Sequence, residues 1–185
     1  MITPTLTASL STPSSHTPTL TLLLINARSL LPKLHHLSAI CAISHPSIVC
    51  VTETWFTQTT PNSAISLPGY DVHRTDRSPD SRNSGGGCAI YTRVELAAQI
   101  IVDPMLSTIR DSIWISSSSC IPSLLLGCIY IPPSLRYRHI PDLCEILSYA
   151  HALPHSLKVL TGDFNMPKSL GTISLAPHPL YLCCP

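Results

Sequence analysis

Polar side chains stand directly after apolar segments at several places in this sequence, and their types suit phosphate and metal chemistry. Asn26 closes "TLLLIN", Glu53 follows "IVCVT", and both Asp163 and Asn165 follow "KVLTG". A fourth apolar segment, "GCIYIPP", carries Tyr130 before two prolines. Mg²⁺ takes one or two protein carboxylates, while water and phosphate oxygens complete its shell. Glu53, Asp163 and Asn165 therefore form a candidate Mg²⁺ site with hard oxygen ligands.

The segments that carry these residues have the pattern of buried strands, because each is a short apolar run that closes on a polar residue. Polar side chains at the ends of neighbouring core strands lie at one rim of a sheet, where a rigid scaffold can hold a site. Asp and Asn also end strands simply by forming turns. Position alone favours that simpler interpretation for Asp163 and Asn165.

The remaining pattern predicts a mixed α/β domain. Leu30, Leu34, Leu37 and Cys41 recur at helical spacing in "SLLPKLHHLSAICAI", and a second helix is expected over "PDLCEILSYAHAL", with Pro141 at its start. Three successive segments, "CAIYTRVELAAQIIV", "DSIWIS" and "SLLLGCIYIPP", predict antiparallel strands. Strands bracket both helices, which favours sheets that are covered by helices.

The length of 185 residues fits one domain with less regular ends. Residues 1–19 are rich in Ser, Thr and Pro without a hydrophobic period, which predicts a disordered leader. Residues 20–168 hold the alternating pattern, and residues 169–185 are expected to form an irregular tail. No targeting segment is visible, and no apolar run approaches the roughly 18 residues of a membrane-spanning helix. We therefore expect no membrane partner.

Composition limits the partners further. The net charge is +1, so binding to nucleic acid would depend on local Lys and Arg side chains rather than on bulk charge. The chain has 8 cysteines, most of them in apolar segments, without a CxxC pair or zinc spacing. This usage favours reduced, buried thiols in an intracellular protein.

Five motifs occur in an order that is informative: "NARSL", "VTETW", "GGGCAIYTR", "GCIYIPP" and "LTGDFN". Together they resemble the endonuclease/exonuclease/phosphatase superfamily over residues 20–168. The sequence is most similar to the apurinic-endonuclease-like domain of LINE-type, non-LTR retrotransposons, because of "ARSL", Trp55 after Glu53, and "RTDRS" before "GGGCAIY". The resemblance implies an α/β (α+β) fold, a four-layer α/β/β/α sandwich with the site at one end of its two packed sheets.

The resemblance also implies a role for each candidate residue. Glu53 would bind Mg²⁺, with Mn²⁺ as an alternative, and Asn26 would support the metal and its carboxylate. Tyr130 would donate a hydrogen bond to the scissile phosphate. Asp163 would orient or deprotonate the attacking water, and Asn165 would hold a phosphate oxygen.

The reaction that the resemblance implies is hydrolysis of a DNA phosphodiester, which nicks one strand and leaves a 3′-hydroxyl that primes reverse transcription. DNA is then the expected partner, together with a downstream reverse transcriptase in the parent element. A functional copy would act in the nucleus.

The resemblance also implies further strands after "LTGDFN" and a final Ser-Asp-His-type motif. Residues 169–185 hold no such motif, and His178 in "APHPLY" lacks an adjacent Asp. The sequence is therefore interpreted as C-terminally truncated and as inactive alone, because a general acid/base contributes about 10²–10⁴ to the rate. Three alternatives stay open: an apurinic repair endonuclease, a phosphoesterase for small substrates, and a non-catalytic remnant.

Structural interpretations of the same residues also exist. Glu53 could be a solvated strand-end carboxylate, although the combined motifs favour a metal ligand. Asn26 could cap the helix that follows it. Tyr130 could be an ordinary aromatic residue of a half-buried strand.

Two other features are better explained by structure than by chemistry. Arg74, Asp76 and Arg77 are more typical of an ion-paired surface loop than of DNA contacts. The three glycines at residues 85–87 lack the Lys of a phosphate-binding loop, which favours a flexible hairpin.

Overall fold

The computed structural model describes residues 6–10, 20–77, 85–119, 123–166 and 180–183, of which the first and last segments are described by their backbone only. Within these residues, ten strands form two five-stranded sheets. The first sheet has the order β1 (Leu6–Leu10), β2 (Leu20–Asn26), β3 (Ile48–Thr52), β5 (Cys88–Arg93) and β4 (Tyr70–Thr75). The second has the order β10 (Leu180–Cys183), β9 (Leu157–Asp163), β8 (Leu124–Tyr130), β7 (Ser112–Ser117) and β6 (Gln99–Ile100).

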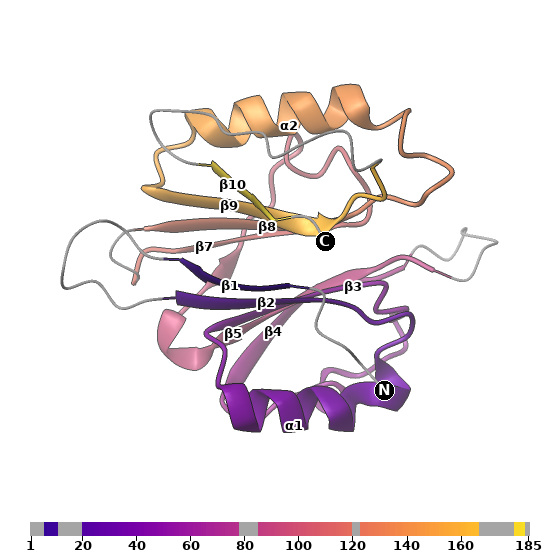
Figure 1. Cartoon of the computed structure of the whole chain (residues 1–185), viewed down its shortest axis with the longest axis vertical. Helices are drawn as coiled ribbons and strands as arrows, with labels where there is room; N and C mark the ends of the chain where they lie inside the picture. The colour runs from indigo at the N-terminus through magenta and orange to yellow at the C-terminus, as the bar shows by residue number, and fades with distance from the viewer. Residues whose placement is uncertain (1–5, 11–19, 78–84, 120–122, 167–179, 184–185) are drawn as a thin grey trace.

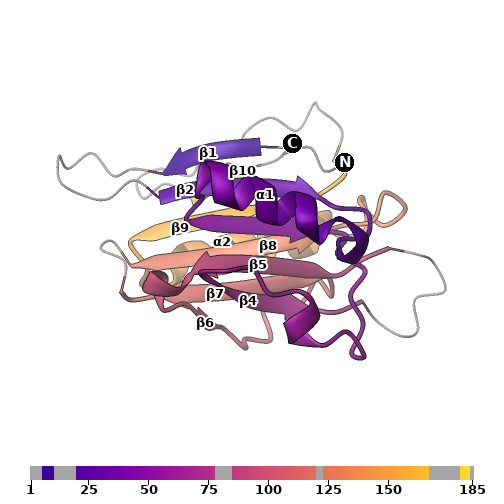
Figure 2. The ribbon, with the colours of Figure 1, turned by 90° about the horizontal axis from the view of Figure 1, so that it is seen from below.

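The two sheets pack face to face between two helices (Figure 1). Helix α1 (Leu34–Ser44) covers the outer face of the first sheet, and helix α2 (Ile140–Ala152) covers that of the second. Seen from the α1 side, that helix runs across the first sheet with the second sheet behind it (Figure 2). This arrangement confirms the four-layer α/β/β/α sandwich that the motifs predicted.

Each central strand buries both of its faces, which explains its unbroken apolar sequence. In β2, Leu22 and Leu24 lie in the core between the sheets, whereas Leu23 and Ile25 pack in the core under α1. Successive side chains of a strand point to opposite faces, so one apolar run contributes to both layers. Burying one such side chain stabilises the fold by about 1.5–3 kcal/mol.

Two parallel strand pairs determine where the polar strand ends meet. Strands β2 and β3 are parallel, with α1 between them in sequence, and Asn26 lies opposite Thr52. Strands β8 and β9 are parallel, with α2 between them, and Tyr130 lies opposite Asp163. The carboxyl ends of a parallel pair share one edge, so each sheet presents its polar residues together.

One part of the strand prediction is wrong. The segment "CAIYTRVELAAQIIV" is divided by a 3₁₀ turn at Val94–Leu96, and Ala97 follows it with φ of 44°. This turn carries the chain from one sheet to the other, so β5 pairs with β3 and β4 while β6 pairs with β7. The antiparallel pairing of "DSIWIS" with "SLLLGCIYI", as β7 with β8, is confirmed.

Both ends of the described chain contain strands where none was expected. Strand β1, within the predicted leader, pairs antiparallel with β2, and β10, within the predicted tail, pairs parallel with β9. A sheet edge presents unpaired N–H and C=O groups, and these additions pair them at β2 and β9. The other residues of 1–19 and 169–185 lie outside the described residues, and the domain boundaries stay a prediction.

Both predicted helices are present, but α1 begins later than the sequence pattern suggested. A 3₁₀ turn at Leu31–Lys33, which contains Pro32, precedes α1, so the regular helix begins at Leu34. Within the part of the chain that the structure describes, neither helix has the length and apolar character needed to span a bilayer.

Candidate active site

Asn26 joins the two sheets at the end where the parallel pairs terminate. Its amide nitrogen Nδ2 donates to Oε1 of Glu53 at 2.8 Å and to Oδ2 of Asp163 at 2.6 Å. Its carbonyl Oδ1 accepts the backbone N–H of Arg28 at 3.2 Å. Helix α1 starts at Leu34 without a side-chain cap, so the alternative role of Asn26 as its cap is wrong. Asn26 instead holds two carboxylates from different sheets beside one another.

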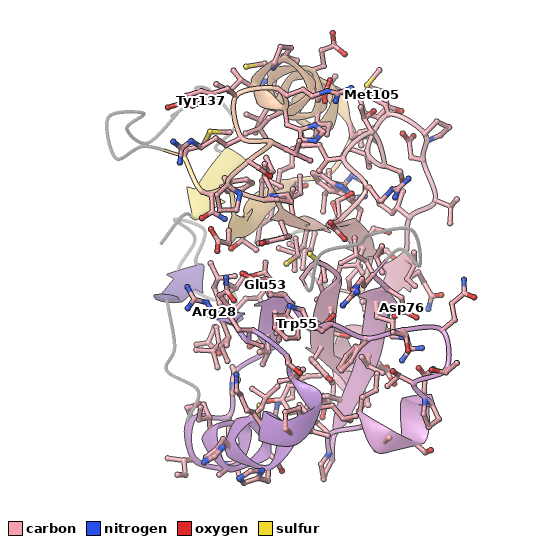
Figure 3. The ribbon with its side chains drawn as sticks, turned by 90° about the vertical axis from the view of Figure 1, so that its right-hand side faces the viewer. Arg28, Glu53, Trp55, Asp76, Met105 and Tyr137 are labelled. Atoms are coloured by element: carbon pink, nitrogen blue, oxygen red, sulfur yellow. The ribbon has the colours of Figure 1, made fainter. Side chains whose placement is uncertain are left out.

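The backbone after β3 presents Glu53 in an uncommon conformation. Glu53 has φ of 53° and Trp55 has φ of 58°, values that non-glycine residues rarely adopt. The Glu53 carbonyl accepts the N–H of Ser29 at 2.9 Å, and this bond joins the turn to the segment after β2. Figure 3 looks onto this end of the molecule, where Glu53 lies near the junction of the two sheets. Such strain often accompanies functional sites, because the surrounding structure must maintain it.

Tyr130 contributes a hydroxyl to the same place. Only 6% of the residue is exposed, and its ring belongs to the core between the sheets. Burial raises the pKa of Tyr130, and the nearby charges of Glu53 and Asp163 and a hydrogen bond with Glu53 raise it further. The phenol therefore stays protonated and available as a donor. Tyr130 is a core aromatic residue and a member of the polar cluster.

Asp163 and Asn165 form a turn, and Asp163 also reaches the cluster. Oδ1 of Asp163 accepts the Asn165 N–H at 3.1 Å, and Asn165 Nδ2 donates to the carbonyl of Ile131 at 3.0 Å. The second oxygen of Asp163 is the one that reaches Asn26. The simple turn interpretation is therefore correct but incomplete, because the turn positions Asp163 for contact with the other sheet.

A glycine loop and Asp111 support this end of the molecule, and sequence reasoning missed the part played by Asp111. The carbonyls of Gly86 and Gly87 accept the N–H groups of Trp55 and Thr54 at 3.1 and 3.2 Å. Oδ1 of Asp111 accepts the Gly87 N–H at 2.9 Å. The three glycines have φ of 144°, 87° and 79°, so this described part of the predicted flexible hairpin is a specific, anchored turn.

Asp111 also connects the loop to Tyr130. Its backbone carbonyl accepts the Tyr130 N–H at 2.8 Å. Burial raises the pKa of Asp111, and the hydrogen bond from Gly87 acts in the opposite direction. The run of three glycines indicated a special turn in the sequence. Its partner Asp111 is 24 residues from Gly87 in the chain, so no local pattern connects the two.

Comparison with known proteins agrees with this geometry. Residues 23–182 match the endonuclease/exonuclease/phosphatase family. The chain belongs to that family. No curated protein matches the sequence.

Solved structures of the family share the fold at low identity. The 3′ phosphatase NExo from Neisseria, bound to a product DNA hairpin, is 20% identical with a TM-score of 0.58, covering 78% of this chain and 57% of its own. An AP endonuclease from Archaeoglobus fulgidus is 16% identical with a TM-score of 0.58, covering 84% and 61%. The endonuclease domain of TRAS1, a telomere-specific non-LTR retrotransposon, is 17% identical with a TM-score of 0.57, covering 82% and 63%. The chain thus spans about three-fifths of the length of these structures.

The carboxylates fit the kind of metal that the family employs. Nucleases of this family generally use divalent metal ions. The carboxylate oxygens of Glu53 and Asp163 both accept hydrogen bonds from Nδ2 of Asn26, so they lie close together. Both side chains are partly exposed. Among the described residues there is no group of three or more His, Cys, Asp or Glu that could hold a metal. Two carboxylates suit Mg²⁺, which keeps several waters, better than they suit a metal that requires an all-protein shell.

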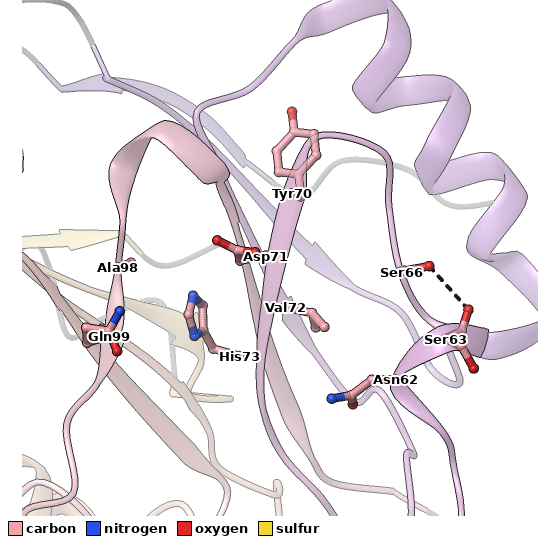
Figure 4. A pocket seen from close by; sticks show the side chains of 9 residues that line it. All are labelled: Asn62, Ser63, Ser66, Tyr70, Asp71, Val72, His73, Ala98 and Gln99. Carbon is pink, nitrogen blue, oxygen red and sulfur yellow. Dashed lines mark hydrogen bonds between the residues drawn. The ribbon is translucent and has the colours of Figure 1, made fainter.

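A hollow at the opposite end of β4 and β5 lacks this chemistry. It is lined by Tyr70, Asp71, His73 and polar residues of the 62–66 turn (Figure 4). His73 is buried, which lowers its pKa, and it shares a hydrogen bond with Thr92 at 3.2 Å. One carboxylate and a neutral imidazole that already has a partner offer no clustered site.

The ion-paired loop that the sequence favoured is confirmed in part. Nε of Arg74 lies 3.1 Å from Oδ1 of Asp76. The guanidinium of Arg74 also lies over the ring of Phe56, 5.8 Å from its centre. Arg74 is therefore held by structural contacts.

Proposed function

We propose that this protein is a metal-dependent phosphodiesterase of the DNA-nicking, retrotransposon type. The observation that supports it best is the pair of hydrogen bonds from Asn26, which hold Glu53 and Asp163 beside one another. The hydroxyl of Tyr130 bonds to the same Glu53. A phosphate oxygen, an ion and an attacking water can all be accommodated where these groups meet.

Each side chain has a distinct part in the proposed reaction. Glu53 would hold Mg²⁺, or Mn²⁺ in its place, and the ion when bound would neutralise charge on the phosphate. Tyr130 would donate a hydrogen bond to a non-bridging phosphate oxygen, and the Asn165 amide would donate a hydrogen bond to another. Asp163 would accept a hydrogen bond from the attacking water and take its proton as the water oxygen bonds to phosphorus. The bond from phosphorus to the 3′-oxygen would break, and solvent would protonate that oxygen to give the 3′-hydroxyl. Asn26 positions both carboxylates.

The family and the motifs support the choice of substrate. The solved relatives include a phosphatase bound to a DNA hairpin and a retrotransposon endonuclease domain. "NARSL" and Trp55 after Glu53 favour the retrotransposon branch. The reverse transcriptase and the nuclear location follow from that branch.

We expect catalysis by this polypeptide alone to be slow but measurable when the protein is in large excess. Within the described part of the chain no histidine donates a hydrogen bond to Asp163, whose carboxylate accepts hydrogen bonds from Asn26 and Asn165. A general acid/base contributes about 10²–10⁴ to the rate, so the residues in place provide only part of the acceleration.

Nicking of supercoiled plasmid DNA, with protein in large excess and millimolar Mg²⁺, tests the proposal. We expect slow conversion to open circles that EDTA stops, and a rate at least about 100-fold lower for Glu53→Gln and Asp163→Asn. The variants keep the shape of each side chain and serve as controls for contaminating nuclease. Equal rates in all three proteins, or no nicking by the wild type, would contradict the proposal and favour a non-catalytic remnant.

A substrate comparison separates the proposal from repair of abasic sites. Apurinic endonucleases occur among the structural relatives. A duplex with one abasic site and the matched intact duplex should be cut at similar rates by a retrotransposon-type enzyme. A strong preference for the abasic duplex would instead support the repair alternative.

A further inference from the structure

The ammonium group of Lys33 binds the backbone that directly follows Asn26. Nζ of Lys33 donates to the carbonyl of Ala27 at 2.5 Å and to the carbonyl of Arg28 at 2.8 Å. Lys33 is the last residue of the 3₁₀ turn before α1, and it is partly buried. One side chain therefore holds two successive carbonyls of the loop that follows β2.

The position of Lys33 in the helix is unfavourable for a cation that has no special partner. Helix α1 begins at the next residue, Leu34. The N-terminus of a helix carries a partial positive charge, so an ammonium group at this place is repelled by it. The two carbonyl oxygens compensate for that repulsion, which gives this lysine a specific reason to be where it is.

The backbone of the loop has a conformation that a cation can stabilise. Arg28 has φ of 42° and Ser29 has φ of 75°, values that non-glycine residues rarely adopt. The carbonyls of Ala27 and Arg28 both turn toward one ammonium group, so the negative ends of two neighbouring peptide dipoles lie close together. The positive charge of Lys33 offsets their repulsion and helps to maintain the strained loop.

The peptide group that Lys33 binds also orients the side chain of Asn26. The carbonyl of Ala27 and the N–H of Arg28 belong to one trans peptide group and point to opposite sides of it. The carbonyl meets Lys33, and the N–H donates to Oδ1 of Asn26 at 3.2 Å. A cation on the carbonyl polarises the peptide, which makes its N–H a stronger donor. With Oδ1 fixed in this way, Nδ2 stays directed at the two carboxylates.

The same loop also contacts the backbone of Glu53. The N–H of Ser29 donates to the Glu53 carbonyl at 2.9 Å. Arg28 and Glu53 lie at the same end of the molecule (Figure 3). A shift of this loop would therefore move the Asn26 amide and the turn that presents Glu53 together.

We propose that Lys33 is a positioning residue of the candidate active site. By binding two carbonyls of the loop it fixes the orientation of the Asn26 amide, and through that amide it holds Glu53 and Asp163 beside one another. It acts through the backbone and not by contact with the ion or the phosphate. The expected effect on Mg²⁺ binding rests on the proposed function, whereas the orientation of Asn26 can be measured without metal or substrate.

Nuclear magnetic resonance of the ¹⁵N-labelled protein in EDTA tests the orientation directly. The side-chain amide signal of Asn26 is assigned as the one that is lost in Asn26→Ala. Lys33→Met removes the charge and the donors but keeps an unbranched side chain. We expect the Nδ2 hydrogens of Asn26 to exchange with water at least about 10-fold faster in this variant, because a charge-assisted hydrogen bond that holds the loop is lost.

Lys158→Met is the matched control. Lys158 is buried, and its Nζ also donates to a backbone carbonyl, that of His151, at 2.5 Å. It lies near the start of β9, at the other end of the strand from Asp163. Both variants should lower the stability to urea, but only Lys33→Met should alter the exchange of Asn26. Lys33→Gln, which keeps an uncharged donor, should change the exchange in the same direction and provides a milder variant if Lys33→Met is not folded.

Calorimetric titration of Mg²⁺ into the same proteins connects Lys33 to the carboxylates. We expect binding at least about 3-fold weaker in Lys33→Met than in the wild type, because the two carboxylates are less well held, and unchanged binding in Lys158→Met.

The outcomes separate this proposal from the proposed function. Unchanged exchange of Asn26 in folded Lys33→Met would overturn the positioning role, even if nicking depends on Glu53 and Asp163. Faster exchange in Lys33→Met, with a wild type that neither binds Mg²⁺ nor nicks DNA, would retain the role of Lys33 in orienting Asn26 and reject the hydrolytic function. Equally faster exchange in Lys158→Met would show a general loosening of the fold and would also overturn the positioning role.

Discussion

The side chain of Asn26 connects the two sheets at the candidate site. Both hydrogens of its amide are used on carboxylates that belong to different sheets. Two ionised carboxylates held close together repel one another, and a donor between them offsets that repulsion. A carboxamide has the right shape and polarity for this position, whereas a third carboxylate does not.

Substitution of Asn26 gives a prediction with an internal control. Asn26→Ala removes two hydrogen bonds but lets water enter, and we expect it to lower the free energy of unfolding by about 1–3 kcal/mol. Asn26→Asp keeps the shape and adds a third negative charge, and it should cost a further ~1–2 kcal/mol at pH 7. Urea unfolding of both variants measures the difference.

The extra loss should depend on pH and on metal. Protonation removes the added charge, so the two variants should converge as the pH falls below about 4, where carboxylates titrate. Millimolar Mg²⁺ should also reduce the difference, because a bound cation neutralises the charge. Equal stabilities of the two variants at pH 7 would show that Glu53 and Asp163 are not held together in solution.

The residues of the cluster were accessible from sequence to different degrees. Asn26, Glu53, Tyr130, Asp163 and Asn165 could be proposed because each follows an apolar strand within a motif. Asp111 could not, since nothing near it in the chain indicates that its carboxylate supports the glycine loop. Contacts of this kind depend on tertiary packing, which local patterns do not encode.

At the scale of elements, strand β9 depends on a close approach to β8. Gly162 has φ of 145°, and a Cβ placed on it would lie 1.8 Å from the carbonyl oxygen of Ile129. No side chain can be accommodated there without separating the two strands. The register that places Tyr130 opposite Asp163 therefore requires glycine at this position.

Gly162→Ala should destabilise the protein severely, by at least about 4 kcal/mol, because backbone atoms must move apart. Gly69→Ala is the matched control. Gly69 also has a positive φ, of 78°, but its Cβ would meet no atom within 4 Å. Only the conformational cost of about 1–2 kcal/mol is expected there. Thermal unfolding followed by circular dichroism compares them, and similar losses in both variants would mean that β8 and β9 are not packed this closely.

Helices and strands with a local apolar pattern could be predicted from the sequence. Those that depend on pairing with a distant strand were missed. The core strands and both helices follow from apolar runs and helical spacing. The transfer of the chain between sheets after β5 depends on a short turn at Val94–Leu96 that resembles a continued strand. Strands β1 and β10 gain their pairing from the open edges of β2 and β9, so their own sequences contain little signal.

At the scale of the whole molecule, the candidate site exists only because two sheets are packed together. The β2–β3 pair provides Asn26 and Glu53, and the β8–β9 pair provides Tyr130 and Asp163. Neither half holds both carboxylates. The packing of one sheet on the other leaves no periodic pattern in the sequence. The layered arrangement could therefore be predicted from the family motifs but not from periodicity.

Titration calorimetry of Mg²⁺ into the wild type and into Glu53→Gln and Asp163→Asn examines whether the two sheets create one metal site. We expect a single ion per chain in the wild type and at least about 10-fold weaker binding in each variant, because the ion would depend on carboxylates from both sheets. Unaltered Mg²⁺ binding in Glu53→Gln, or the absence of binding in the wild type, would contradict the account.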